Sequence, residues 1–291
     1  MTSLIDEITR RLPDRWLATT LAPGALWLAV AALALRLGHG HALDVDAARA
    51  AARDAAGMVR DQPAEMVAYG LLLAGAAVLA SGAARLVGGA LRELWLGRWP
   101  GVLAGPARRL TGRRARRAGE RLAGDRTELP GVYLPRTPTW IGDRVRLAGA
   151  RVDAQYGLSL PLIWPRLWQL VDDGARDLVR QARSGFESAC TLGGWAALYA
   201  VLAVAWWPAA LVAAVLLALS WRRGRLAAAV FADTLESTVD LHHRALAQAL
   251  GHQLGPGPGI PPAVADAIND QLHKGATPQP QAARPATELI R

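Results

Sequence analysis

Three long stretches without a charged residue constrain the fold of this chain more than any other feature. They cover residues 16–35 (20 residues), 66–84 (19 residues) and 188–221 (34 residues). A helix rises about 1.5 Å per residue and the hydrocarbon core of a bilayer is about 30 Å thick, so about 20 apolar residues suffice to cross it. Apolar residues make up 52% of the chain and are concentrated in these blocks, unlike the periodic pattern of a soluble domain. The sequence therefore predicts an all-α integral membrane protein.

The third block is too long for one ordinary span. A straight helix of 34 residues would measure about 50 Å, which exceeds what tilt accommodates. Trp206 and Trp207 suit a membrane–water interface, and Pro208 ends one helix or begins the next. We therefore expect a hairpin of two spans, 188–206 and 208–224. The second leg is short, so a re-entrant leg or one long helix are alternatives.

The arginine distribution predicts the topology. Residues 98–126 contain nine arginines and two acidic residues, whereas the loop 38–65 contains three arginines and five acidic residues. Because short arginine-rich segments stay on the cytoplasmic side, four spans with both termini in the cytoplasm satisfy this rule. The expected segments are a cytoplasmic amphipathic helix (1–15), a first span (16–37), an extracytoplasmic loop (38–65), a second span with its cytoplasmic extension (66–97), an arginine-rich juxtamembrane segment (98–126), a cytoplasmic helical region (127–187), the hairpin, a cytoplasmic helix (225–251) and a Pro/Gly-rich, mostly disordered tail (252–291). A cleaved signal peptide is the alternative for the first span, but its apolar stretch is longer than usual for one.

The arginine-rich segment has one main interpretation. The net charge is +9, and Lys274 is the single lysine. Basic clusters next to a membrane span bind anionic lipid headgroups, with about 1 kcal/mol for each charge. The segment lacks the aromatic residues with which proteins stack on single strands, so we expect no nucleic-acid partner. The predicted lipid contacts are Arg108, Arg109, Arg113, Arg114, Arg116 and Arg117.

An unusual apolar fragment, YGLSLPLIWPRLWQLV, precedes the third block. It contains Trp164, Arg166 and Trp168, with Pro165 between them, and predicts a short kinked helix. The two tryptophans are four residues apart and share one helix face. They either pack in a cytoplasmic core, lie at the headgroup level or form a docking surface for a partner.

Small residues follow a regular spacing in the second block. Ala76, Ala80 and Ala84 recur every four positions, which lets two helices approach closely in lipid. An alanine-rich genome explains the same pattern. The helix–helix contact is therefore a hypothesis that the spacing favours.

Recognisable catalytic chemistry is scarce. The sequence has no phosphate-binding GxxxxGK[ST] loop and no G-x-S-x-G motif, and we expect no cofactor. Glu236, Asp240 and His243 share a helix face at a spacing that could bind a metal, although a solvated face explains them equally well. His39 and His41 are a weaker pair in the outer loop. Cys190 is a single cysteine, which excludes an internal disulfide.

Two stretches carry a family resemblance. YGLSLPLIWPRLWQL (156–170) and DLHHRALAQALG (240–251) resemble a pattern in uncharacterised multi-pass membrane proteins of high-GC bacteria. The resemblance covers about residues 133–251. It implies the membrane architecture and no activity, cofactor or site residue.

These observations favour a non-catalytic anchor or adaptor in the bacterial inner membrane. Its cytoplasmic helices would form a platform for an unidentified protein partner or for a second copy of the chain. A small homo-oligomeric channel or transporter component, assembled through the alanine spacing, is one alternative. A membrane enzyme with a metal site on the 225–251 helix is the other.

Overall fold

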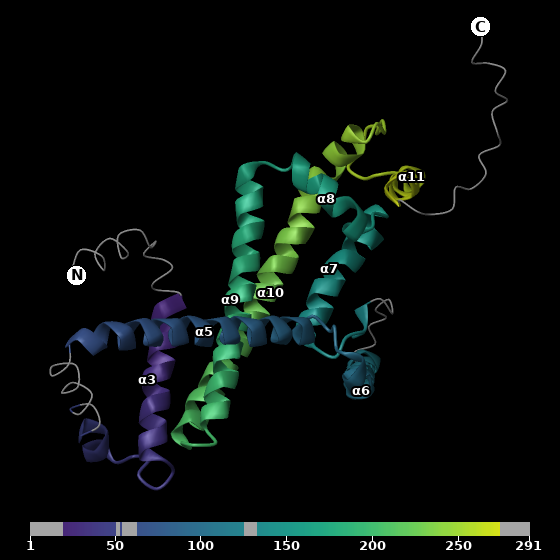
Figure 1. Cartoon of the computed structure of the whole chain (residues 1–291). Coiled ribbons are helices and arrows are strands. Elements are labelled where there is room, and N and C mark those ends of the chain that lie inside the picture. The colour runs from purple at the N-terminus through teal and green to yellow at the C-terminus, as the bar shows by residue number, and fades with distance from the viewer. Residues whose placement is uncertain (1–19, 51–52, 54–62, 125–132, 274–291) are drawn as a thin grey trace.

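The computed structural model describes residues 20–50, 53, 63–124 and 133–273 (Figure 1). These residues form helices and turns and contain no strand, so the all-α prediction is confirmed for this part of the chain. The predicted helix 1–15, most of the second half of the loop 38–65 and residues 274–291 lie outside it. The helices are α3 (Ala22–Leu37), α5 (Pro63–Trp95), the 3-10 turn η2 (Gly101–Leu103), α6 (Ala104–Gly124), α7 (Trp140–Tyr156), α8 (Leu160–Leu170), α9 (Asp173–Leu202), α10 (Pro208–Ala249) and α11 (Pro262–Leu272).

Helices α9 and α10 form a long antiparallel hairpin that organises the molecule (Figure 1). It turns at residues 203–207, and Pro208 occupies the first turn of α10, where its missing N–H costs no hydrogen bond. Ser220 Oγ donates to the carbonyl oxygen of Ala189 at 2.7 Å and joins the two helices in a buried position. Because α10 is one continuous helix of 42 residues, the predicted boundary between a span and a cytoplasmic helix at 224–225 falls inside a helix, with no break.

Helix α5 crosses α3 and α9 (Figure 1) through residues too small to keep the backbones apart. A Cβ on Gly24 of α3 would overlap the carbonyl oxygen of Ala77, and a Cβ on Gly194 of α9 would overlap that of Ala84. Ser81 Oγ donates to the carbonyl oxygen of Thr20 at 2.5 Å. Such close helix contacts are typical of proteins in lipid, where packing replaces the hydrophobic effect as the driving force.

Many large apolar side chains of these helices point outward. Leu71, Leu79 and Leu86 of α5 are 68%, 75% and 78% exposed, and Val204 at the hairpin turn is 83% exposed. We call α3, α5, residues 188–202 of α9 and residues 208–221 of α10 the apolar region. Among the described residues, one helix is long and apolar enough to cross a membrane, over Ala68–Trp95, and Ala22–Leu37 is a shorter apolar helix.

The opposite end of the hairpin carries a compact helical core. It is formed by α7, α8, α11 and residues 235–249 of α10, which we call the subdomain. Ile163, Leu167, Leu246 and Ile268 are completely or almost completely buried there. Thr139 caps α7 by accepting from the N–H of Gly142, and Asp172 caps α9 by accepting from the N–H of Ala175.

The C-terminal segment differs from the prediction of a mostly disordered tail. Residues 252–273 return to the subdomain, and α11 packs its Ala265, Ile268 and Leu272 side chains into the core. The Pro- and Gly-rich composition did not indicate that α11 packs into the core, because the apolar stripe of α11 contains only these few residues.

Candidate functional site

Helix α6 exposes a cationic face. Six of its arginine side chains are exposed, Arg121 near its end and five that are predicted lipid contacts: Arg108, Arg109, Arg113, Arg116 and Arg117. At 100° per residue they occupy about half of the helix circumference. Within the part of the chain that the structure describes, Arg109, Arg113, Arg116 and Arg117 have no acidic partner. These five side chains form a surface complementary to phosphate groups, which we call the arginine face.

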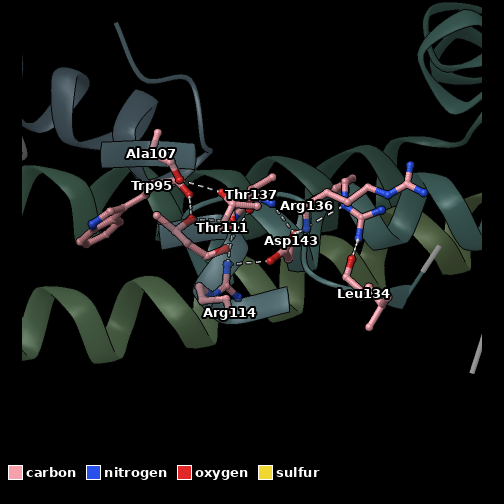
Figure 2. A network of polar contacts seen from close by, with 11 residues as sticks. Trp95, Ala107, Thr111, Arg114, Leu134, Arg136, Thr137 and Asp143 are labelled. Atoms are coloured by element: carbon pink, nitrogen blue, oxygen red, sulfur yellow. Dashed lines mark hydrogen bonds and ion pairs between the residues drawn. The ribbon is translucent and has the colours of Figure 1, made fainter. Parts of the chain in front are cut away.

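Arg114 has a different role from the one predicted. Its Nη1 lies 2.7 Å from Oδ2 of Asp143 and donates to the carbonyl oxygen of Thr137 at 2.5 Å (Figure 2). The lipid contact predicted for this residue is therefore wrong. The reason is that the Arg114 side chain lies on the side of α6 that faces the first turn of α7, away from the arginine face.

Asp143 is the centre of a network that joins three parts of the molecule (Figure 2). This side chain is 5% exposed, and its Oδ1 accepts from the backbone N–H groups of Arg136 and Thr137 at 2.9 and 3.0 Å. A buried carboxylate is stable only with such compensation. Arg114 supplies the opposite charge, so Asp143 holds α6 and the loop 134–139 against α7.

The same network reaches the end of α5. Thr139 Oγ1 donates to the carbonyl oxygen of Trp95, and Thr137 Oγ1 donates to the carbonyl oxygen of Thr139 at 2.9 Å (Figure 2). We call this group, with Asp143 and Arg114, the α5–α7 joint. Sequence reasoning missed Asp143. Its one signal was an acidic residue in the first turn of a predicted helix, where a negative charge is favourable.

The two tryptophans of α8 are half-buried. Trp164 and Trp168 pack on the subdomain core with ring centroids 5.9 Å apart. The guanidinium of Arg180 lies 5.9 Å from the centroid of the Trp168 ring. Arg166 donates to the carbonyl oxygen of Leu162, and α8 continues through Pro165. Part of each ring is therefore used in core packing and part remains accessible.

The alanines of α5 that were predicted to contact another helix pack against helices of the same chain. Ala80 and Ala84 are buried and Ala76 is half-buried. Ala84 faces Gly194 of α9, and the neighbouring Ala77 faces Gly24 of α3. The small-residue face of α5 is thus occupied by helices of the same chain.

Glu236, Asp240 and His243 do not converge on one point. Glu236 pairs with Arg144 and Arg151 at 3.0 and 3.2 Å, whereas Asp240 accepts from the hydroxyl of Tyr156 at 2.9 Å. His243 is buried, with Nε2 3.0 Å from the carbonyl oxygen of Pro258.

Among the described residues no group of histidine, cysteine and acidic side chains is arranged to hold a metal. The proposed metal site is therefore wrong, because arginine and tyrosine partners occupy its carboxylates. His39 Nδ1 lies 2.8 Å from the carbonyl oxygen of Ala205 at the hairpin turn, and His41 is exposed.

Tyr156 is the titratable group of the subdomain with a large shift. Burial, and then its hydrogen bond to Asp240, raise the pKa of Tyr156 to about 12. Its ring stacks on His243 with centroids 4.4 Å apart. The hydroxyl therefore stays protonated and ties α7 to α10.

Cys190 is buried against the side chains of Trp95, Phe186 and Ala228. This position faces neighbouring helices and leaves the thiol inaccessible.

Comparison with protein-family models, with curated proteins and with solved structures found no match to this chain. The resemblance to uncharacterised multi-pass membrane proteins therefore stays a prediction.

Proposed function

We propose that the protein is a non-catalytic integral membrane anchor of the bacterial inner membrane that holds a helical platform in the cytoplasm. The observation that carries the proposal is that exposed large apolar side chains are concentrated in the apolar region. Leu71, Leu79 and Leu86 of that region face outward, whereas Ile163 and Leu167 of the subdomain face inward. Contiguous exposed apolar surface of this extent marks contact with lipid or protein.

In this proposal the chain crosses the membrane four times, with both termini in the cytoplasm. Helix α5 is the complete span, and α3 and the two hairpin legs, across which α5 lies (Figure 1), also enter the bilayer. The legs 188–202 and 208–221 measure about 22 and 21 Å, less than the hydrocarbon core, so they need local thinning of the bilayer or flanking polar groups in the headgroup region. Because α5 crosses α3 and α9 (Figure 1), the helices differ in tilt.

The arginine face supports the same orientation. It follows directly on α5, and its five guanidinium groups would contribute about 1 kcal/mol each on an anionic leaflet. Arg114, held by Asp143, turns this face away from the protein. The α5–α7 joint thus fixes a lipid-binding helix at the boundary between the apolar region and the subdomain.

The subdomain is the platform. Helix α10 passes from the apolar region into the subdomain as one continuous helix, so the two parts are connected without a flexible linker. A cytoplasmic partner protein would dock on the accessible surface of α8 around Trp164, Arg166 and Trp168. The channel alternative rested on Ala76, Ala80 and Ala84 contacting another copy, and contacts within the chain bury Ala80 and Ala84.

The test is extraction and crosslinking of the full chain in its own host. The protein should remain in the membrane after alkaline carbonate washing and should leave it only with detergent. A photo-crosslinker at Arg166 should capture a stoichiometric soluble protein, whereas one at Leu79, facing lipid, should not. Release by carbonate would contradict the anchor, and recovery of only lipid or further copies of the chain from both positions would contradict the platform.

A further inference from the structure

A pocket of about 570 Å³ lies beside the α5–α7 joint. Four helices contribute to it: the end of α5, the start of α7, the middle of α9 and the middle of α10. Its apolar lining includes Val145, Phe186 and Phe231, and its charged lining includes four arginines and two glutamates. The volume is in the range of small-molecule sites, which are largely apolar with a few polar groups.

The charged groups of the pocket have a surplus of positive charge. Glu93 is shared between Arg92 and Arg98 at 3.2 and 3.1 Å. Glu187 is shared between Arg92 and Arg183 at 3.9 and 2.9 Å. Three arginines are thus bridged by two carboxylates, and Arg146, which contacts Asp143, adds a fourth guanidinium to the lining.

The most exposed arginines of the pocket are Arg98 and Arg183. The side chains of Arg98 and Arg183 are 72% and 68% exposed, whereas that of Arg92 is 38% exposed. Exposed ion pairs of this kind contribute little to stability, so their guanidinium groups can turn from a glutamate to a ligand at small cost. A guanidinium binds a phosphate or a carboxylate through two parallel hydrogen bonds, and a phosphate group has three acceptor oxygens that several arginines can share.

We infer that this pocket binds a phosphate-bearing amphiphile. The phosphate lies on Arg98, Arg183 and Arg92, and the apolar part of the molecule lies on Phe186 and Phe231. The proposed source is an anionic phospholipid of the bilayer, and inorganic phosphate, which has no apolar part, is the alternative that the test distinguishes. The inference rests on the proposed membrane location only for this source, since the pocket itself is defined by the contacts of the folded chain.

The pocket is tested with the full chain in a non-ionic detergent and short-chain lipids. Native mass spectrometry measures the dissociation constants of dihexanoyl phosphatidic acid, dihexanoyl phosphatidylcholine and inorganic phosphate. We expect phosphatidic acid to bind about tenfold or more tightly than either of the others, because it alone combines a strongly anionic phosphate with acyl chains. Equal affinity for inorganic phosphate would overturn the inference, since the apolar lining would then have no role.

Matched variants separate a site from general electrostatics. Arg98→Gln with Arg183→Gln should weaken phosphatidic acid binding by about tenfold or more. Arg222→Gln with Arg223→Gln, at exposed positions of α10 outside both the pocket and the arginine face, removes the same charge and should change it by less than about threefold. Phe231→Ser should weaken phosphatidic acid and leave inorganic phosphate unchanged. Equal losses in the two double variants would overturn the inference.

Failure here is distinguishable from failure of the proposed function. Short-chain lipid reaches the pocket in solution, so binding is measured whether or not the protein is an anchor. A protein that resists carbonate extraction but does not bind phosphatidic acid contradicts only the pocket. A protein released by carbonate that binds it contradicts only the anchor.

Discussion

The apolar region and the subdomain are packed in opposite ways. In the subdomain, the leucine and isoleucine side chains of Ile163, Leu167 and Leu246 fill the interior. In the apolar region, small residues such as Gly194 fill the helix crossings, and many leucines, such as Leu71 and Leu79, face outward. Burial of large apolar side chains stabilises a fold in water, whereas lipid provides no such driving force and leaves close packing of small residues. The difference supports the proposal that one part of the chain folds in lipid and the other in water.

The largest effect is expected at the α5–α7 joint between the two regions. Asp143→Ala removes a buried carboxylate with two backbone donors and an arginine partner, and should lower the free energy of unfolding by about 3–5 kcal/mol. Asp153→Ala, at an exposed position of the same helix, should change it by less than about 0.5 kcal/mol. Denaturant unfolding in detergent, followed by circular dichroism, measures both. Equal effects would show that the joint does not couple the regions.

A pair of leucine truncations tests the opposite packing directly. Leu167→Ala should lower the free energy of unfolding by about 2–5 kcal/mol, because Leu167 is completely buried. Leu79→Ala, at a 75% exposed position of α5, should change it by less than about 0.5 kcal/mol. The same unfolding measurement applies. A large loss for Leu79→Ala would mean that protein, and not lipid, covers this face.

A pair of glycine substitutions tests the crossing of α5 and α9. Gly194→Ala places a methyl group against the backbone of Ala84 and should destabilise the protein by about 1–3 kcal/mol. Gly185→Ala, on the same helix, meets only the Cβ of Ala227 at 3.9 Å and should stabilise it by about 0.5–1 kcal/mol. Thermal unfolding midpoints in detergent compare the two. Stabilisation by both would contradict the close crossing.

The smallest effect concerns the pH dependence of the subdomain. The pKa of Tyr156 is raised from 10.0 to about 12 on folding, so its contribution is complete below pH 10 and is lost as the pH rises toward 12. Stability should fall by up to about 1.4 kcal/mol per pH unit in this window. Tyr156→Phe should be about 0.5–1.5 kcal/mol less stable at pH 8 and lose this part of the slope. Urea titrations at pH 9 to 11.5 measure how the free energy of unfolding depends on pH. The same dependence in Tyr156→Phe and in the original protein would contradict the raised pKa of Tyr156.

Local signals in the sequence predict the helices and their caps well. Thr139, Asp172 and Pro208 act on residues within one turn, and such short-range rules do not depend on the rest of the fold. The packing of α11 was not predictable from the sequence, because its short apolar stripe contacts core residues that lie far away along the chain.

The candidate site was less predictable than the fold. The cationic character of residues 98–126 follows from composition, but the inward turn of Arg114 depends on Asp143, 29 positions along the chain. The same limit affected Glu236 and Asp240, whose spacing on one helix says nothing of the partners Arg144 and Tyr156 on another. Spacing along one helix shows which residues share a face, but the partners that those residues bind depend on the neighbouring helix.

Thiol labelling in membranes tests the central claim most directly. Leu79 and Leu241 are 75% and 80% exposed, so two reporters, Leu79→Cys and Leu241→Cys, are equally accessible in the isolated fold. In a Cys190→Ala background and sealed vesicles of both orientations, a membrane-impermeant maleimide should label Leu241→Cys from the cytoplasmic side only. It should label Leu79→Cys from neither side, because a thiol in lipid does not form the reactive thiolate. Equally fast labelling of both cysteines would contradict the account.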